Sequence, residues 1–210
     1  MTDSQEPVFG FTRTELRDRN TVYAPGLFQD QTVVVTGAGG GLGLAIAALF
    51  ARLGARLAIC GRNPEKLESA AEFLRSFGGE VMAREMTIRD PEQVAAFVDA
   101  VHERFGGLNV LVNNAGGQFP QPALDFSIKG WNAVIDTNLN GTWWMMQAVA
   151  KNWVETGTQG NIVSIVADVW RGMPGIAHTA AARAGVIFLS KSVAVEWAPY
   201  GVRVNCVAPG

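Results

Sequence analysis

From Gln31 to the end of the chain, short β-branched apolar runs alternate with longer stretches whose apolar residues recur at helical spacing. Short apolar runs bounded by turn residues are typical of buried strands. They predict strands at residues 32–35, 56–60, 81–86, 110–113, 161–166 and 203–207. The stretches between them predict helices at 45–53, 64–77, 91–105, 128–156 (one long helix or two short ones) and 180–197.

Strands that alternate with helices indicate βαβ units and a parallel sheet. Right-handed crossovers then place helices on both faces. The sequence therefore predicts an α/β fold: a doubly wound, Rossmann-like parallel sheet over residues 31–210. Residues 1–30 mix charges without periodicity and contain a Pro25-Gly26 turn signal, so we expect an extended N-terminal arm.

Composition excludes several classes of protein. Hydrophobic residues make up 48% of the chain and charged residues 17%, which excludes intrinsic disorder. The net charge of −2 gives no reason to expect nucleic acid or a membrane surface as a partner. No basic segment followed by an apolar core opens the chain, and no apolar stretch is long enough to span a membrane. We expect a cytoplasmic protein.

The two cysteines do not indicate a disulfide framework. Both lie in predicted strands, Cys60 in the second and Cys206 in the sixth. If the strand order is 3-2-1-4-5-6, these strands are far apart and a bridge is excluded. We interpret both as small buried side chains in a reducing compartment.

A glycine-rich segment follows the first predicted strand and precedes an apolar helix. Glycine lets the backbone approach a ligand closely, and a helix N-terminus favours a pyrophosphate. In the strand–turn–helix context this predicts a dinucleotide site, with a tight turn that binds no ligand as the alternative. The candidate residues are Gly37, Gly39, Gly41, Leu42 and Gly43.

The ends of the second and fourth predicted strands extend this site. An acid after the second strand would bind the ribose hydroxyl of NAD, but the sequence there is Cys60-Gly61-Arg62-Asn63. Arg62 is placed to pair with a 2′-phosphate, which predicts NADP(H); the alternative is a solvated arginine at the start of a helix. After the fourth strand, we expect Asn114, Ala115 and Gly116 to form a wall of the cofactor crevice.

Four ordered motifs together resemble the short-chain dehydrogenase/reductase superfamily, from about residue 28 onward. They are the segments 36–43, 113–116, 138–141 and 203–210. Residues 23–27, 117–119, 129–131 and 178–186 are similar to the peroxisomal trans-2-enoyl-CoA reductase group. The resemblance implies a homodimer or homotetramer, NADPH-dependent reduction of an enoyl thioester, and a small-molecule (acyl-CoA) substrate. It also leads us to expect that the superfamily's C-terminal lid and last strand are absent from this chain.

The catalytic positions depart from the pattern of most members of the superfamily. Thr179 and Arg183 stand where most have Tyr and Lys, and Val166 and Ala167 align with the usual Ser. Asn138 is retained. The resemblance thus places the candidate catalytic residues at Asn138, Thr179 and Arg183, with Arg183 also toward the cofactor. No metal site is expected.

These departures bear on the reaction. A Thr hydroxyl is a far weaker acid than a Tyr phenol, so ordinary carbonyl reduction is disfavoured. Enoyl reduction forms an enolate, which needs hydrogen-bond donors more than a strong acid. Thr179 can donate, and Arg183 can hold the nicotinamide ribose. His178 or Asp168 are candidates for the α-proton, with burial at a helix start (His178) and a solvated loop acid (Asp168) as alternatives.

Three further residues carry structural expectations, and two alternative functions stay open. We expect His102 to be a surface residue, and Trp143 and Trp144 to belong to the core or a subunit contact. A carbonyl reductase or alcohol dehydrogenase with a substituted triad is a second function. A dinucleotide-binding protein without catalysis is a third.

Overall fold

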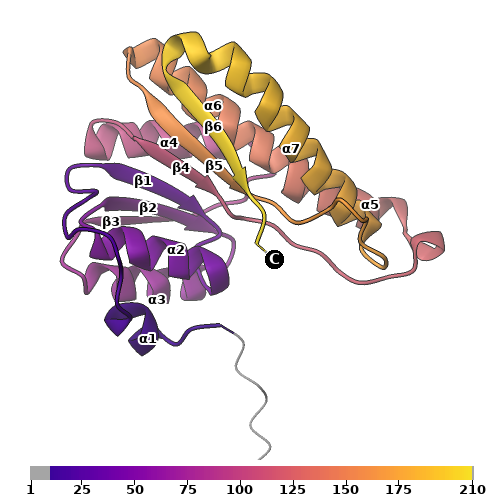
Figure 1. The fold of residues 1–210 in the computed structure, drawn as a ribbon, viewed down its shortest axis with the longest axis horizontal. Helices are drawn as coiled ribbons and strands as arrows, with labels where there is room; N and C mark the ends of the chain where they lie inside the picture. Colours follow the sequence, from indigo (N-terminus) through magenta and orange to yellow (C-terminus); the bar gives the residue numbers. More distant parts are fainter. Residues whose placement is uncertain (1–9, 210) are drawn as a thin grey trace, which may run out of the picture.

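A six-stranded parallel sheet forms the centre of the computed structural model, which describes residues 10–209 (Figure 1). Its order is β3-β2-β1-β4-β5-β6, the order assumed above for the two cysteines, and every neighbouring pair is parallel, as predicted. The strands are β1 (Thr32–Thr36), β2 (Arg56–Gly61), β3 (Val81–Glu85), β4 (Val110–Asn113), β5 (Gly160–Ile165) and β6 (Val202–Val207). The order changes direction between β1 and β4, where a doubly wound sheet opens a crevice.

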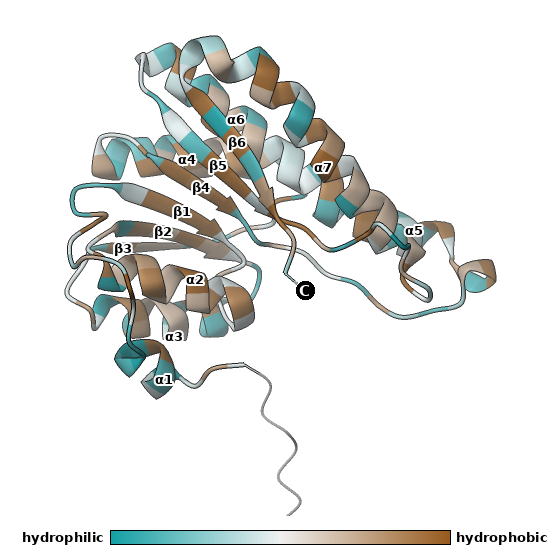
Figure 2. Ribbon diagram, viewed as in Figure 1, coloured by the Kyte–Doolittle hydropathy of each residue, from teal (hydrophilic) through white to brown (hydrophobic). Residues whose placement is uncertain are grey.

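Helices cover both faces of the sheet, as expected for a doubly wound fold. On one face lie α2 (Gly41–Arg52) and α3 (Pro64–Arg75); on the other lie α4 (Pro91–Phe105), α6 (Gly141–Thr156) and α7 (Ala177–Trp197). Two buried apolar clusters fill the layers between helices and sheet, and Figure 2 shows the hydrophobic strands between them. Both faces of β1 are buried, which is why its sequence is apolar without alternation.

The helix starts follow the capping chemistry of the sequence. Asn63 accepts a hydrogen bond from the Lys66 backbone N–H at 2.8 Å, and Pro64 opens α3. Asp90 caps α4 by accepting from the N–H groups of Glu92 and Gln93. The Gln93 side chain does not complete a reciprocal capping box, because its oxygen accepts from Thr87.

One region differs from the sequence-based expectations, and in a second the structure decides between two alternatives. The arm is not wholly extended: α1 (Arg13–Asp18) forms at a capping box between Thr12 and Glu15, and its arginines lie over Phe73 of α3. Residues 1–9 of the arm lie outside the described residues. The stretch predicted as one or two helices is α5 (Ile128–Ile135) and α6 joined by a π-helical segment, Asp136–Asn140.

Other expectations on residue environment can be compared directly. Cys60 and Cys206 are both free thiols, on β2 and β6, which confirms that no bridge joins them. His102 is half-buried rather than a plain surface residue. Trp143 and Trp144 pack against the core, and Trp143 stacks on Trp197 with ring centroids 6.2 Å apart.

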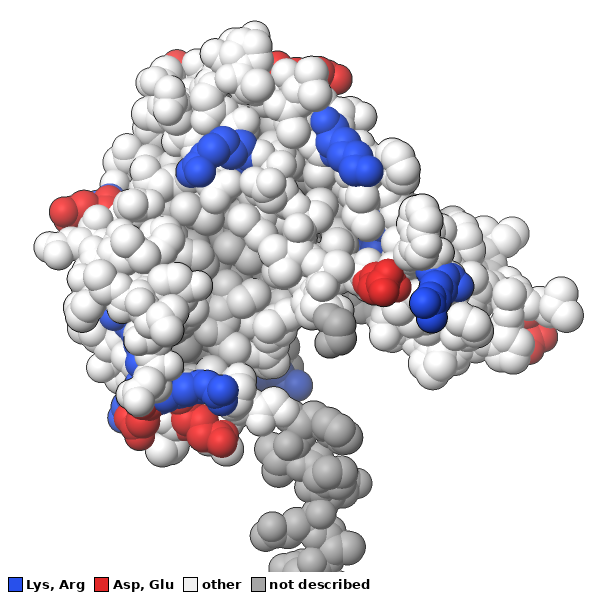
Figure 3. Space-filling model, in the orientation of Figure 1, with Lys and Arg blue, Asp and Glu red and all other residues white. Residues whose placement is uncertain are grey.

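The face seen in Figure 3 carries scattered basic and acidic side chains rather than a broad patch of one sign. None of the described helices has the length and apolar character that crossing a membrane would need. No group of three or more metal-ligating side chains is found in residues 10–209.

Candidate active site

The glycine-rich turn forms one wall of a cavity of about 460 Å³ at the carboxyl edge of the sheet. Gly37 follows β1 in the left-handed region, with φ +70°, and turns the chain toward α2. Gly40 precedes the first residue of α2 without any side-chain cap, so the first N–H groups of that helix are free for a ligand. The cavity therefore lies where a helix N-terminus can bind an anion.

The turn is held against the end of β4 by a set of short hydrogen bonds. The Thr36 hydroxyl accepts from the backbone N–H groups of Asn114 (3.1 Å) and Ala115 (2.9 Å). The Asn114 side-chain amide donates to the carbonyl oxygens of Thr36 and Gly37 at 3.0 and 3.3 Å. A Cβ on Gly43 would meet that amide and the Gly37 carbonyl. Gly43 thus permits the packing of α2 on the turn.

The open side of the turn fits a diphosphate group. A Cβ built on Gly40 meets no atom within 4 Å, so the backbone here borders open space that a ligand can occupy. The cavity is also lined by three cationic side chains and no Asp or Glu; the cations are Arg62, Lys66 and Arg89. An anionic ligand would meet no like-charged carboxylate in this lining.

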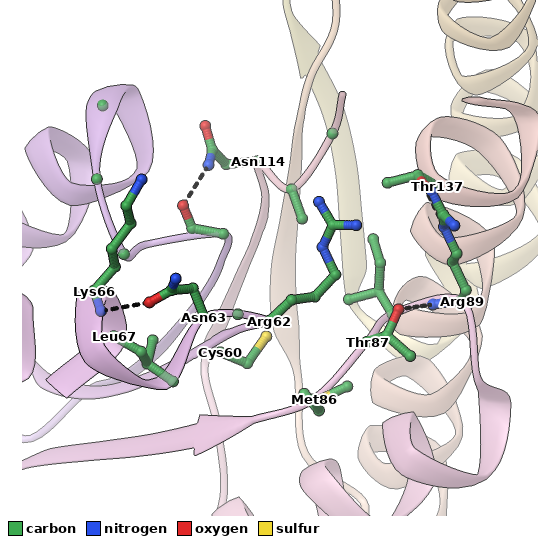
Figure 4. A pocket seen from close by; sticks show the side chains of 18 residues that line it. Cys60, Arg62, Asn63, Lys66, Leu67, Met86, Thr87, Arg89, Asn114 and Thr137 are labelled. Atoms are coloured by element: carbon green, nitrogen blue, oxygen red, sulfur yellow. Dashed lines mark hydrogen bonds between the residues drawn. The ribbon is translucent and has the colours of Figure 1, made fainter. Parts of the chain in front are cut away.

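The three cations approach the cavity from different elements. Figure 4 shows Arg62 reaching up from the end of β2, Lys66 on α3 at one side and Arg89 beside Thr137 at the other. Arg89 donates to the Thr137 hydroxyl and to the Ala133 carbonyl, which tethers it to the helix layer. Within residues 10–209, neither Arg62 nor Lys66 forms a salt bridge, which leaves their side chains available to a phosphate.

Asn138 and Arg183 lie next to the cavity, around Gly116. The Asn138 side chain donates to the Gly117 carbonyl and accepts from the Gly117 N–H, each at 2.9 Å. Both of its polar groups are therefore used to hold the loop after β4. A Cβ on Gly116 would meet the Arg183 guanidinium and lie 2.9 Å from the Asn138 oxygen. Burial lowers the pKa of Arg183, and among the described residues it has no acidic partner.

Thr179 lies one turn before Arg183 on α7 and is buried, with 3% of its surface exposed. Its hydroxyl lies 3.3 Å from Nδ1 of His178, and its N–H donates to the same atom at 2.7 Å. The His178 ring packs against Phe119 and Phe126. Asp168 is exposed and accepts from the Trp170 backbone N–H, and the buried Val166 offers no hydroxyl at the position that aligns with Ser.

The sequence-predicted site residues separate into two groups. Gly37, Gly39, Gly41, Arg62, Asn114, Ala115 and Gly116 line the cavity. Leu42, Gly43, Asn138, Thr179 and Arg183 do not; Leu42 is 49% exposed and Gly43 is buried against Asn114. Sequence reasoning missed Lys66, Arg89 and Thr137. Lys66 could have been predicted, because it is a cation in the first turn of the helix that follows β2. Nothing in the sequence indicated that Arg89 bonds to α5 and lines the cavity.

Comparison with known proteins agrees with this geometry. The family model for short chain dehydrogenase matches residues 31–210. The probable 2,4-dienoyl-CoA reductase of Bacillus subtilis (strain 168) is 38% identical over 87% of this chain and 72% of its own length. The peroxisomal 2,4-dienoyl-CoA reductase of Danio rerio is 37% identical over 90% of this chain, which spans 63% of that relative.

A solved structure is also similar to this chain. The citronellol catabolism dehydrogenase of Pseudomonas aeruginosa PAO1 superimposes with a TM-score of 0.85, at 42% identity, over 90% of this chain and 78% of that one. The residues that the family model matches include the cavity, the glycine turn and α7. The chain belongs to the short-chain dehydrogenase family of oxidoreductases, within which it is similar to the enoyl-CoA reductase-like members.

Proposed function

We propose that this oxidoreductase uses NADP(H) and reduces a 2-enoyl-CoA-like thioester. The observation that carries the proposal is the partly buried Arg183 beside Gly116, one turn from the small hydroxyl of Thr179. This pair can donate hydrogen bonds to a developing oxyanion but offers no phenol to act as an acid. Relatives that are 37–38% identical are named 2,4-dienoyl-CoA reductases, which supports an unsaturated thioester as the substrate class.

Arg62 and Lys66 support NADP(H) as the cofactor. Both line the cavity on either side of Asn63, and no acid in that lining would repel a 2′-phosphate. An Arg or Lys bond to phosphate is charge-assisted and stronger than a bond to a ribose hydroxyl. The glycine turn would hold the pyrophosphate, with Asn114, Ala115 and Gly116 lining the same cavity.

The chain's own residues would then act on the substrate oxygen. When bound, the reduced nicotinamide supplies a hydride to the β-carbon of the conjugated double bond. The electron pair of that double bond would move toward the thioester carbonyl, whose oxygen gains negative charge, and a proton taken from water at the α-carbon would then restore the carbonyl and complete the saturated thioester. Arg183 stabilises that charge and cannot give up its own proton, and Thr179 donates a hydrogen bond to the same oxygen. Asn138 holds the Gly117 loop and acts as a positioning residue.

The direct test is turnover of NADPH with purified protein. We expect oxidation of NADPH with a 2-enoyl-CoA or a 2,4-dienoyl-CoA, followed at 340 nm, and slower turnover with simple ketones. Faster turnover with ketones would favour the second function, a carbonyl reductase or alcohol dehydrogenase. That alternative has support from a relative named gluconate 5-dehydrogenase, from Gluconobacter oxydans (strain 621H), at 35% identity.

One further outcome of this test matters. Tight NADPH binding without turnover on any of these substrates would favour the non-catalytic dinucleotide-binding protein. The homodimer or homotetramer that the resemblance implies stays a prediction, which light scattering coupled to size-exclusion chromatography would test on the same preparation.

A further inference from the structure

His178 is a fully buried side chain that the proposed mechanism does not use. Its exposed fraction is 0%, and its ring stacks on Phe126 with centroids 4.5 Å apart and planes 18° apart. Phe119 contacts the same ring edge to face, at 4.7 Å between centroids. Both phenylalanines come from the segment after β4, so the ring joins the start of α7 to that segment.

Packing alone does not explain why this ring is an imidazole. Nε2 is buried and has no hydrogen-bond partner among the described residues. A buried N–H without a partner is unfavourable, and a Phe at this position would stack on Phe126 without that loss. The atom that accounts for a histidine here is therefore the other ring nitrogen, Nδ1.

Nδ1 faces Thr179. The Thr179 backbone N–H donates to Nδ1 at 2.7 Å and also to the Ile176 carbonyl at 2.9 Å, and the hydroxyl oxygen lies 3.3 Å from Nδ1. An Nδ1 atom that accepts from an N–H carries a lone pair, which places the ring hydrogen on Nε2. Ile176 offers no side-chain cap to α7, so His178 supplies this acceptor at the helix start.

We propose that His178 is a positioning residue for Thr179 and acts through Nδ1; this inference rests on the proposed function. The hydroxyl hydrogen is directed to Nδ1, but that bond is long and shares its lone pair with the backbone N–H. A substrate oxygen that approaches more closely takes the hydroxyl hydrogen with little loss. The imidazole thus fixes the side chain of Thr179 and leaves its hydroxyl free to turn toward the substrate.

Three substitutions separate the atoms of the ring. His178→Asn keeps an acceptor near the place of Nδ1, His178→Gln keeps an N–H near the place of Nε2, and His178→Phe keeps the aromatic shape. With a 2-enoyl-CoA and NADPH, we expect kcat to fall about threefold for the Asn variant and at least about tenfold for the Gln and Phe variants. The KM for NADPH should stay within about twofold in all three, since His178 does not line the cofactor cavity.

The opposite patterns overturn the inference. A wild-type kcat in His178→Phe would mean that the ring only packs. A kcat that is higher in His178→Gln than in His178→Asn would mean that the ring acts through Nε2. A readout without turnover is the ¹⁵N NMR spectrum of the histidine ring in the wild-type protein. We expect Nδ1 without a bound hydrogen, and a hydrogen on Nδ1 would overturn the inference. Lack of turnover by the wild-type protein would contradict the proposed function alone, because the NMR result stands independently.

Discussion

The side-chain amide of Asn114, at the end of β4, donates to the carbonyl oxygen of Gly37 at 3.3 Å, across the point where the strand order changes direction. The bond joins the two loops that flank the crevice. It also explains two glycines by packing rather than by ligand approach: a Cβ on Gly37 would lie 2.9 Å from the Ala115 Cα, and one on Gly43 would meet the Asn114 amide. The turn therefore contains glycines needed for the fold and glycines left open for a ligand.

Gly40→Val should separate cofactor binding from folding. The backbone of Gly40 is extended, with φ 175°, which any residue adopts, and its Cβ would enter open space in the cavity. We expect the melting temperature to stay near that of the wild type. The Kd for NADPH should rise at least about tenfold in isothermal titration, because the side chain fills the space proposed for the pyrophosphate.

Gly43→Val serves as the contrasting variant. Its side chain would displace Asn114 and the Gly37 carbonyl, so both the melting temperature and NADPH binding should fall. Unchanged NADPH affinity in Gly40→Val would place the cofactor somewhere other than this turn.

Arg62→Asp should reverse the cofactor preference. We expect the wild-type protein to bind NADPH more tightly than NADH by about 1.5–3 kcal/mol, the range for a charge-assisted bond to phosphate. The carboxylate would repel a 2′-phosphate and accept from a ribose hydroxyl. Affinities for both cofactors, measured by fluorescence titration, check the reversal.

Arg203→Asp provides a matched change of charge, because Arg203 is exposed on β6 and outside the lining of the cavity. It should leave the preference unchanged. Equal affinity of the wild-type protein for the two cofactors would remove the basis for assigning NADP(H).

The sheet was predictable because most of its strands are short runs rich in apolar residues between turn residues, and β6 alternates apolar with polar residues. Cap residues such as Asn63 and Asp90 also fixed the starts of α3 and α4 to the residue. The start of α7 at Ala177, three residues before the prediction, was not visible, since Ile176 at the N-cap position provides no side-chain cap. The arm's helix α1 had a local signal that sequence reasoning missed, the capping box of Thr12 and Glu15, and contacts distant in sequence, such as the bond from Arg13 to Ser69, also hold it.

The site was only partly predictable, because some of its residues are placed by contacts that are distant in sequence. The glycine turn, Arg62 and Asn114 follow strands directly, so their positions at the carboxyl edge come from topology alone. Arg89 acquires its place in the cavity through the Thr137 hydroxyl on another element. The use of both polar groups of Asn138 by Gly117 likewise requires the folded loop, and no local pattern in the sequence indicates it.

The two thiols should differ sharply in reactivity. Burial raises the pKa of Cys60 from 9.0 to about 12, whereas Cys206 is half-buried and donates to the Ser190 hydroxyl at 3.2 Å. Because the thiolate is the reactive form, we expect a disulfide reagent at pH 8.5 to modify Cys206 and spare Cys60 in the native protein. Both should react in denaturant.

The same shift gives a dependence of stability on pH. The folded state disfavours the Cys60 thiolate, so this contribution to the free energy of unfolding is complete below pH 9 and is lost as pH rises toward 12. Cys60→Ala should remove it, which urea titrations at pH 8 and pH 10 can measure. Rapid native labelling of Cys60 would contradict the burial argument.

Thr179→Val tests the replaced catalytic pair. Valine keeps the shape of threonine and removes only the hydroxyl. Because Thr179 is buried, the substitution does not change the surface of the protein. If Thr179 donates to the enolate oxygen, kcat for a 2-enoyl-CoA should fall by about 10- to 1000-fold, the range for loss of one oxyanion donor. Stopped-flow turnover of NADPH measures this, with the NADPH Kd as the control for an intact cofactor site.

The double variant Thr179→Tyr with Arg183→Lys restores the pair most members carry. It should not be needed for thioester reduction, and any ketone reductase activity it gains would be limited because Val166 supplies no hydroxyl. Full enoyl-CoA activity in Thr179→Val would reduce Thr179 to packing and leave Arg183 as the donor beside Gly116.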